Sequence, residues 1–175
     1  MSTIPFISKN SLPLATLYTK SITTPIGTDI AVSDHDAVYA IQFSPFTPSS
    51  MFKNIIIKPG TTAVLRVVEQ ELEAYFRGTL HHFTIPLRLR GTEFQQKTWQ
   101  QLTCIGYGTT VCYTDLACAI NNPKATRAVG NANGLNPFVI VIPCHRVIAK
   151  AGTLGGYSSG IERKQWLLEH EQKYL

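Results

Sequence analysis

The segment TDLACAINNPKATRAVGNANG, residues 114–134, decides how the second half of this 175-residue chain is expected to fold. Thr114 is a residue type that caps helix N-termini, and it precedes a short helix predicted over 115–120. Pro123 suits the first position of a second helix, which Gly134 ends. Two short helices joined by a tight turn predict a helix-turn-helix.

The second of these helices carries polar residues on one face. Lys124, Arg127 and Asn131 are spaced i, i+3, i+7 and lie apart from a stripe of small apolar residues. The stripe consists of Ala125, Ala128, Val129 and Ala132. Small residues allow close packing against a neighbour, so the other face is free to offer two cations and an amide to a partner. Many helix pairs of this kind bind nothing, and the pattern alone leaves a purely structural role open.

The distribution of charge favours a polyanionic partner. The formal net charge is +5, and residues 116–161 contain no Asp or Glu. The same range contains the cations Lys124, Arg127, Arg146 and Lys150. A field of one sign over such a length is typical of a surface that faces phosphates. The alternative is that these cations only solvate an ordinary protein face.

The first half has the pattern of a mixed α/β unit. Residues 30–33 and 37–43 are predicted strands, and the second of them alternates with period two. Asp34-His35-Asp36 between them is interpreted as a turn rather than a metal site. Apolar residues at helical spacing predict an amphipathic helix over 62–77.

The two halves are expected to be separate domains, 1–88 and 89–175, because Pro and Gly flank the junction and the chain then becomes mostly helical. Thr92 and Gln95 have the spacing of a capping box, which opens a helix that extends through Ile105. No stretch approaches the roughly 20 apolar residues of a membrane span. The N-terminus also lacks a secretory signal, so a cytoplasmic location is expected, or a nuclear one in a eukaryote.

All four cysteines lie in the second half, at Cys104, Cys112, Cys118 and Cys144. They lack the spacing of a zinc site, and a disulfide framework is not expected in a non-secreted chain of this size. Free thiols are therefore predicted, without a metal and without a cofactor. Three of them are predicted to be inert buried thiols.

Cys144 is different because a base and a cation, His145 and Arg146, follow it directly. A thiol is a weak nucleophile until it is deprotonated, and neighbours of these types favour the thiolate. The apolar run 138–142 predicts a buried extended segment, and Pro143 ends it so that Cys144 lies at the edge of a core. The alternative is an inert buried cysteine beside a core histidine.

The string Pro143-Cys-His-Arg-Val147 is similar to the active-site motif of the O6-alkylguanine-DNA alkyltransferases, and the chain is identified as a member. The resemblance covers residues 91–175. Its further motifs are Phe94-Gln-x-x-x-Trp99, Tyr107-Gly108-x-x-x-x-Tyr113, Arg127-Ala-Val-Gly130-x-Ala-Asn133, Asn136-Pro137, Gly156-Tyr157-Ser158-x-Gly160 and Glu162-Arg-Lys-x-Trp166-Leu-Leu. The resemblance implies a ribonuclease-H-like α/β N-terminal domain and a mostly α C-terminal domain with helix-turn-helix or winged-helix-like architecture.

The resemblance also implies the reaction. An O6-alkylguanine, or less readily an O4-alkylthymine, is flipped out of the duplex, and its alkyl group moves irreversibly to Cys144, once per molecule. His145 is implied to activate the thiol through a water, and Glu162 to orient His145. Tyr113 is implied to donate a proton to the departing guanine. The capping-box spacing of Ser159 and Glu162 leaves a purely structural role for Glu162 open.

The same resemblance implies a monomer that binds double-stranded DNA through the minor groove and does not bind membranes. Arg127 is implied to fill the place of the flipped base, with Lys124, Asn131 and Tyr113 as further DNA-binding residues. The implied substrate pocket comprises Val147, Tyr157, Ser158 and Asn136. Trp99 and Trp166 are assigned to the core.

Two other functions fit parts of the pattern. A damage-binding protein without transfer activity would use the helix-turn-helix but not Cys144. A cysteine hydrolase would use Cys144 and His145 as a dyad, and would need an oxyanion hole and repeated turnover.

Overall fold

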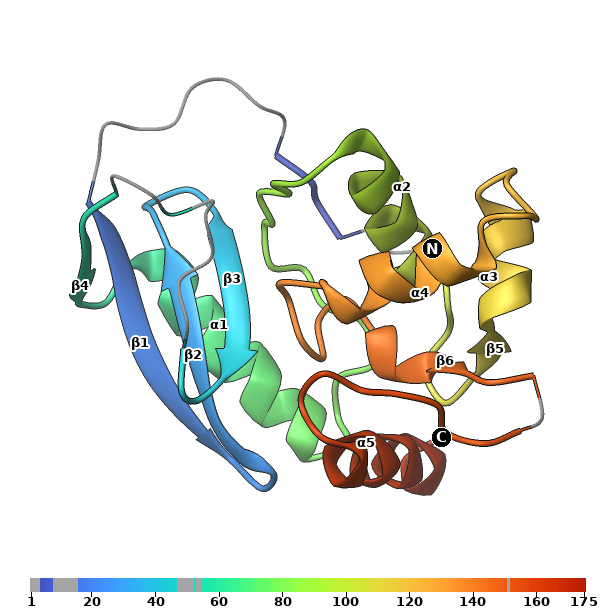
Figure 1. Ribbon diagram of the computed structural model, residues 1–175. Coiled ribbons are helices and arrows are strands. Elements are labelled where there is room, and N and C mark those ends of the chain that lie inside the picture. Colours follow the sequence, from blue (N-terminus) through green and yellow to red (C-terminus); the bar gives the residue numbers. More distant parts are fainter. Residues whose placement is uncertain (1–3, 8–15, 47–51, 53–54, 151) are drawn as a thin grey trace. The chain divides into compact units, whose positions relative to one another are not determined.

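The computed structural model describes residues 4–7, 16–46, 52, 55–150 and 152–175 (Figure 1). The chain forms two compact units, Met1–Arg90 and Gly91–Leu175. The first unit combines a mixed sheet with a helix, and the second is mostly helical.

The sheet of the first unit has the strand order β3-β2-β1-β4. Strands β1, β2 and β3 are antiparallel neighbours, and β4 is parallel to β1. Their bounds are Leu17–Thr24 for β1, Gly27–Ser33 for β2, Val38–Phe43 for β3 and Ile57–Pro59 for β4. The predicted strands 30–33 and 37–43 are confirmed as parts of β2 and β3. β1 was not predicted, since its polar residues hide the alternation.

The predicted turn between β2 and β3 is also confirmed. Asp34 Oδ1 accepts hydrogen bonds from the backbone N–H groups of Asp36, at 2.8 Å, and Ala37, at 2.7 Å. The Asp34 carboxylate therefore satisfies the backbone of the turn, as an aspartate in this position commonly does.

The helix α1, Ala63–Phe76, lies behind the sheet in Figure 1 and buries an apolar face that includes Leu65, Val68 and Leu72. Thr62 is its N-cap, as its Oγ1 accepts a hydrogen bond of 3.1 Å from the Leu65 backbone. The same hydroxyl lies 2.8 Å from the Ser33 hydroxyl, and Thr62 is only 3% exposed. One side chain thus joins the start of the helix to the end of β2.

Thr62→Ala is expected to destabilise the first unit by about 1–2 kcal/mol, because the cap is lost and the Ser33 hydroxyl is left buried without it. Thr62→Ser keeps the hydroxyl and is the matched control. Hydrogen exchange of the α1 backbone amides measures the effect. Equal destabilisation by both substitutions would show that the methyl group, rather than the hydroxyl, stabilises this junction.

In the described part of the second unit there are four α-helices and a short parallel β-pair. The helices are α2, Glu93–Leu102; α3, Tyr113–Ala119; α4, Thr126–Gly134; and α5, Ile161–Lys173. The pair is formed by β5, Val111–Cys112, and β6, Val147–Ile148, which follows a 3₁₀ turn at Cys144–Arg146. Helices α2, α3 and α4 pack together, and α5 packs against the 3₁₀ turn (Figure 1).

The predicted capping box at the start of α2 is confirmed, with Thr92 and Gln95 each bonding to the backbone of the other. The helix ends at Leu102, earlier than predicted. Inside the unit, the Trp99 indole donates a 2.8 Å hydrogen bond to the Ala132 carbonyl, which ties α2 to α4. Trp99 is core as predicted, whereas Trp166 is only half-buried and stacks on His170.

Both predicted helices are present, joined by a turn and packed against each other, but both helix starts differ from the prediction. α3 begins at Tyr113, and Cys112 is its N-cap residue. The Asp115 side chain, in the first turn of the helix, accepts a hydrogen bond of 3.1 Å from the Cys112 backbone N–H and so stabilises this start. α4 begins at Thr126, because a turn closed by the 3.0 Å bond from Ala125 N to Asn122 O occupies the residues before it. Pro123 therefore lies in this turn and not in the helix.

Candidate active site

The segment before Cys144 is a compact buried turn, so the extended structure predicted for 138–142 is wrong. Ile142 N donates to Phe138 O at 2.9 Å, and Val141 N donates to Val139 O at 2.8 Å. Ile140 has φ 69°, a left-handed conformation that is unusual for a β-branched residue. All five residues are buried, as the apolar run indicated.

Asn136 supplies the hydrogen bonds that make this turn possible. Its Nδ2 donates to Ile142 O at 2.8 Å and to Phe138 O at 3.2 Å, while its Oδ1 accepts from Phe138 N at 3.0 Å. A buried backbone needs partners for these groups, and the side chain provides them in place of a neighbouring strand. Asn136 therefore connects the end of α4 to the segment that carries Cys144.

Cys144 is the one buried cysteine, with 3% exposure. Burial raises the pKa of its thiol, and the side chains of Asn136 and Tyr157, together with the Lys164 charge, offset part of the rise. The thiol is therefore protonated at rest and needs a base. Cys104 and Cys118 are exposed and Cys112 is half-buried, so the prediction that all three are buried is wrong.

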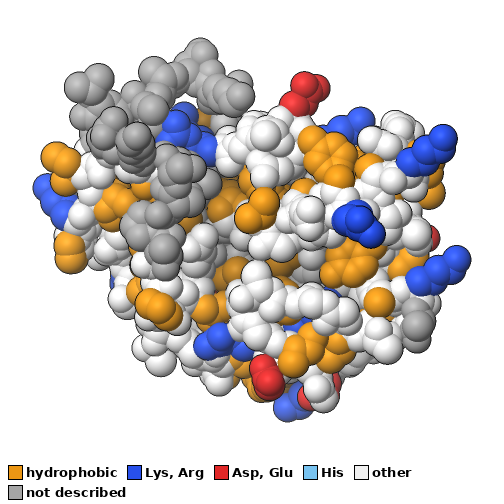
Figure 2. All heavy atoms as spheres, viewed as in Figure 1, with side chains coloured by type: hydrophobic (Ala, Val, Ile, Leu, Met, Phe, Trp, Pro, Cys, Tyr) orange, Lys and Arg blue, Asp and Glu red, His pale blue; other side chains and the backbone are white. Residues whose placement is uncertain are grey.

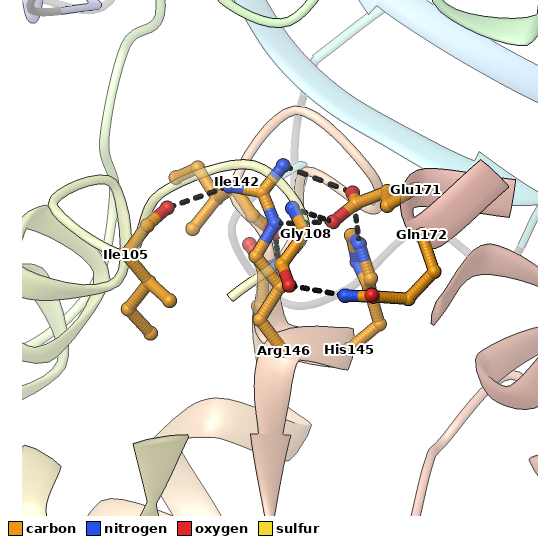
Figure 3. Close-up of polar contacts among 8 residues, drawn as sticks. Ile105, Gly108, Ile142, His145, Arg146, Glu171 and Gln172 are labelled. Carbon is orange, nitrogen blue, oxygen red and sulfur yellow. Dashed lines mark hydrogen bonds and ion pairs between the residues drawn. The ribbon is translucent and has the colours of Figure 1, made fainter. Parts of the chain in front are cut away.

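Glu171, on α5, lies between His145 and Arg146 (Figure 3). Its carboxylate is 2.8 Å from His145 Nε2 and accepts hydrogen bonds of 2.9 Å from both Nε and Nη2 of Arg146. It also accepts a 3.0 Å bond from the Gly108 backbone. Burial alone would raise the pKa of Glu171, but the hydrogen bonds and charges of His145 and Arg146 hold it well below its usual range.

This carboxylate fixes the protonation of His145. A carboxylate only accepts, so Nε2 carries the proton and Nδ1 keeps a free lone pair. Burial lowers the pKa of His145, against the opposing effect of Glu171, so the ring is neutral. Nδ1 is buried and has no hydrogen-bond partner among the described residues. The ring is thus a neutral base next to Cys144 in the chain.

The structure does not bring Glu162 to His145, which corrects the predicted relay. Glu162 is exposed in the first turn of α5. The capping-box alternative is also wrong, because the N-cap is Gly160, without a side-chain cap. Lys164, Leu167 and Glu171 are spaced i, i+3, i+7, so two charged residues share a helix face with a buried leucine. That pattern was the available signal for Glu171.

Lys164 is a second functional candidate that the sequence reasoning missed. It is fully buried, and its Nζ donates to the carbonyls of Val147 and Leu154, both at 2.5 Å, and of Gly156 at 3.5 Å. Burial lowers its pKa to about 8, against an opposing effect of the Cys144 thiolate. Lys164 therefore holds the 154–156 loop against β6 and places a positive charge near the sulfur.

A cavity of about 350 Å³ opens beside this network. Its lining residues are Tyr113, Gly130, Asn133, Gly134, Gly156, Tyr157 and Ser158. Of the predicted pocket residues, Tyr157 and Ser158 line it, while Val147 and Asn136 are buried and are not among its lining residues. Cys144 is not a lining residue either, but the lining Tyr157 lies within hydrogen-bonding reach of its thiol.

Tyr113, which lines the cavity, directly follows β5 and is the first residue of α3. Cβ atoms placed on Gly130 and Gly155 would lie 3.8 Å and 3.5 Å from its ring, at van der Waals distance, so the ring lies next to both glycines. Burial, and next the charge of Cys144, raise the pKa of Tyr113. The phenol therefore keeps its proton near the sulfur.

The predicted DNA-binding residues of the second helix are exposed. Lys124, Arg127 and Asn131 all face solvent, and Figure 2 shows Lys and Arg side chains projecting over α3 and α4. The predicted stripe is only partly buried, because Val129 and Ala132 are covered whereas Ala128 is exposed. The exposed face of α4 thus combines Arg127 with a small residue, and Lys124 is exposed in the turn just before the helix.

The described residues offer no group of three or more His, Cys, Asp or Glu side chains that could hold a metal ion. No helix in the described ranges is long and apolar enough to cross a membrane.

Fold and site together define a class: a protein with a mixed-sheet unit and a mostly helical unit, the latter with a buried cysteine, a neutral histidine base and an adjoining cavity. A family model described as 6-O-methylguanine DNA methyltransferase, DNA binding domain, matches residues 93–173. The methylated-DNA–protein-cysteine methyltransferase of Haemophilus influenzae is 40% identical over 91% of this chain and 88% of its own length. That of Methanosarcina acetivorans is 39% identical over 89% of this chain and 98% of its own.

The solved structures similar to this chain belong to the same family as these relatives. The Mycobacterium tuberculosis O6-methylguanine methyltransferase superposes with a TM-score of 0.80 at 38% identity, covering 91% of this chain and 94% of that one. The M. tuberculosis protein solved in complex with DNA gives 0.80 at 39% identity, with the same coverage. The chain belongs to the methylated-DNA–protein-cysteine methyltransferase family, whose members repair alkylated DNA by transferring the alkyl group to a cysteine of their own.

Proposed function

We propose that this protein takes the alkyl group from the O6 position of a guanine in DNA and transfers it to Cys144. The observation that carries the proposal is the neutral His145, whose buried Nδ1 has no hydrogen-bond partner among the described residues. Glu171 holds its ring, and His145 directly follows the one buried cysteine in the chain. A thiol in this setting is protonated at rest and loses its proton to the neighbouring base only when it reacts.

The proposed proton transfer runs from the Cys144 thiol to His145 Nδ1 through one bridging water. Lys164 and the polar groups of Asn136 and Tyr157 stabilise the thiolate. The sulfur then forms a bond to the alkyl carbon as the bond from that carbon to O6 breaks. Tyr113 protonates the departing guanine, and the proton held on His145 is then returned to Tyr113 through solvent. The net change is that the alkyl carbon passes from O6 to the sulfur and the thiol proton passes to the guanine.

The product explains why each molecule acts once. A thioether is neutral and is a poor leaving group, and its carbon lies in a buried site. The proposed roles of the surrounding side chains are to stabilise the thiolate and to transfer protons. Among the described residues, none is proposed as a second nucleophile that would attack the thioether carbon. The alkyl group therefore stays on the protein.

For DNA, we propose that the exposed face of α4 enters the minor groove and that Arg127 occupies the place of the flipped base, while Lys124 and Asn131 contact the backbone. The solved relative in complex with DNA supports duplex binding. The cavity lined by Tyr113, Tyr157 and Ser158 then receives the base. A monomeric state, a weaker activity on O4-alkylthymine, the ribonuclease-H-like and winged-helix-like details and the cytoplasmic or nuclear location remain predictions.

Mass spectrometry of the protein after incubation with damaged DNA tests the proposal. Incubation with duplex DNA containing O6-methylguanine is expected to add about 14 Da, one methylene-sized increment, to the protein. Peptide mapping is expected to place it on Cys144, with the reaction stopping at one equivalent. Cys144→Ser should bind the same DNA and keep its mass.

Each other outcome identifies a rival. An unmodified wild-type protein that binds the DNA would be a damage-binding protein. Continued release of product beyond one equivalent would be a turnover enzyme, such as a cysteine hydrolase. Alkylation of the exposed Cys104 or Cys118 would place the acceptor elsewhere.

A further inference from the structure

The side chain of Asn133, in the last turn of α4, has a fixed orientation next to Cys144. Asn133 is 4% exposed, and its Nδ2 donates a 3.3 Å hydrogen bond to the Cys144 carbonyl. A carbonyl oxygen only accepts, so the amide NH₂ must point to Cys144. The Oδ1 of Asn133 is thereby directed to another side.

That Oδ1 is buried and has no hydrogen-bond partner among the described residues. Buried polar atoms are nearly always paired in folded proteins, so an unpaired one calls for a partner. Asn133 is also a lining residue of the cavity. A Cβ atom placed on the lining Gly134 or Gly156 would meet nothing within 4 Å, so the space there is open.

The chemistry of the lesion limits which donor could fill this position. Alkylation of O6 leaves N1 of guanine without its proton, and N9 is bonded to the sugar. The exocyclic 2-amino group is then the only N–H donor of the base. An O4-alkylthymine has lost the corresponding N3 proton and carries no N–H donor.

We propose that Asn133 Oδ1 accepts a hydrogen bond from the 2-amino group of the alkylated guanine and thereby determines specificity for guanine. The inference rests on the proposed function. The same amide holds the Cys144 carbonyl, so recognition of the base is coupled to the position of the nucleophile. O4-alkylthymine leaves Oδ1 unpaired, which disfavours it.

The test compares single-turnover transfer rates, at saturating DNA, from duplexes that contain O6-methylguanine or O6-methylhypoxanthine, which lacks the 2-amino group. The wild-type protein is expected to react about tenfold faster with O6-methylguanine, since a site built for a donor rejects the analogue without it. In Asn133→Leu this ratio is expected to fall to about one. The ratio cancels any general loss of activity in the variant.

Asn133→Asp keeps an acceptor and loses the donor, so it is expected to slow both substrates while preserving much of the preference. Asn133→Ala replaces the leucine variant if leucine prevents folding, and it is expected to lose the preference as well. A preference that survives in both Asn133→Leu and Asn133→Ala would overturn the inference and leave Asn133 a structural role. Failure of the wild-type protein to alkylate Cys144 from O6-methylguanine would instead overturn the proposed function.

Discussion

Replacing Glu171 by glutamine is expected to destabilise the second unit by about 3–5 kcal/mol, the usual effect of removing one partner of a buried ion pair. The Arg146 side chain is 7% exposed and forms two hydrogen bonds to this carboxylate. Glutamine offers one acceptor oxygen and no charge, so Arg146 would be left buried without an anion. Both tryptophans, Trp99 and Trp166, belong to this unit, and their fluorescence in urea reports its unfolding.

The same substitution is expected to slow alkyl transfer by about 100-fold or more, the range of a general base that is lost or misplaced. Glu171 positions His145 and stabilises the imidazolium that forms when the thiol proton is taken. At higher pH the thiol ionises without this help. The deficit of Glu171→Gln in single-turnover rate should therefore shrink as the pH rises, which a purely structural defect would not produce.

The dependence of stability on pH has a defined sign. The folded-state pKa of Glu171 lies well below its usual value. Its contribution is therefore complete above the unfolded pKa of about 4.3 and is lost as the pH falls toward the folded pKa. The difference in unfolding free energy between wild type and Glu171→Gln should be constant from about pH 6 to 8 and decrease below about pH 4.

Glu162→Gln is the matched control, because it makes the same chemical change on the same helix at an exposed position. It is expected to leave both stability and transfer rate near wild type. If Glu162→Gln were slow and Glu171→Gln normal, the relay would run through Glu162 and the arrangement described for His145 would be incorrect.

The features that could be predicted from the sequence depend on local chemistry. The capping box of Thr92 and Gln95 and the turn at Asp34 need only residues two or three positions apart, and both are present. Strand 30–33 was predicted from its apolar residues, and strand 37–43 from its period-two pattern. β1 was missed because its pairing with β2, rather than its own sequence, makes it a strand.

The site was harder to predict because its contacts span long separations. His145 and Glu171 are 26 residues apart, and the family resemblance implied the nearer Glu162 as the partner of His145. The run 138–142 was predicted to be extended because apolar residues without a polar partner favour strands. The side chain of Asn136 satisfies the backbone there, which allows a turn instead. The motif around Cys144 located the site, but only the fold gives its partners.

Arg127→Ala is expected to slow transfer from O6-methylguanine in duplex DNA by about 10- to 100-fold, the equivalent of 1–3 kcal/mol of lost stacking. The side chain is exposed on α4, where the proposed insertion would place it in the base stack. Transfer from free O6-benzylguanine needs no flipping and should be nearly unchanged. Single-turnover rates on the two substrates measure the difference.

Lys124→Ala separates stacking from simple attraction, because Lys124 is an exposed cation just before the same helix. Its loss should weaken DNA binding and lower the slope of log K against log salt by about one, without changing the rate at saturating DNA. Arg127→Ala should instead lower the rate at saturation. An unpaired lesion in a bulge costs less to extrude, so it should recover part of that rate. Equal losses on duplex and free base would mean that Arg127 does not take the place of the flipped guanine.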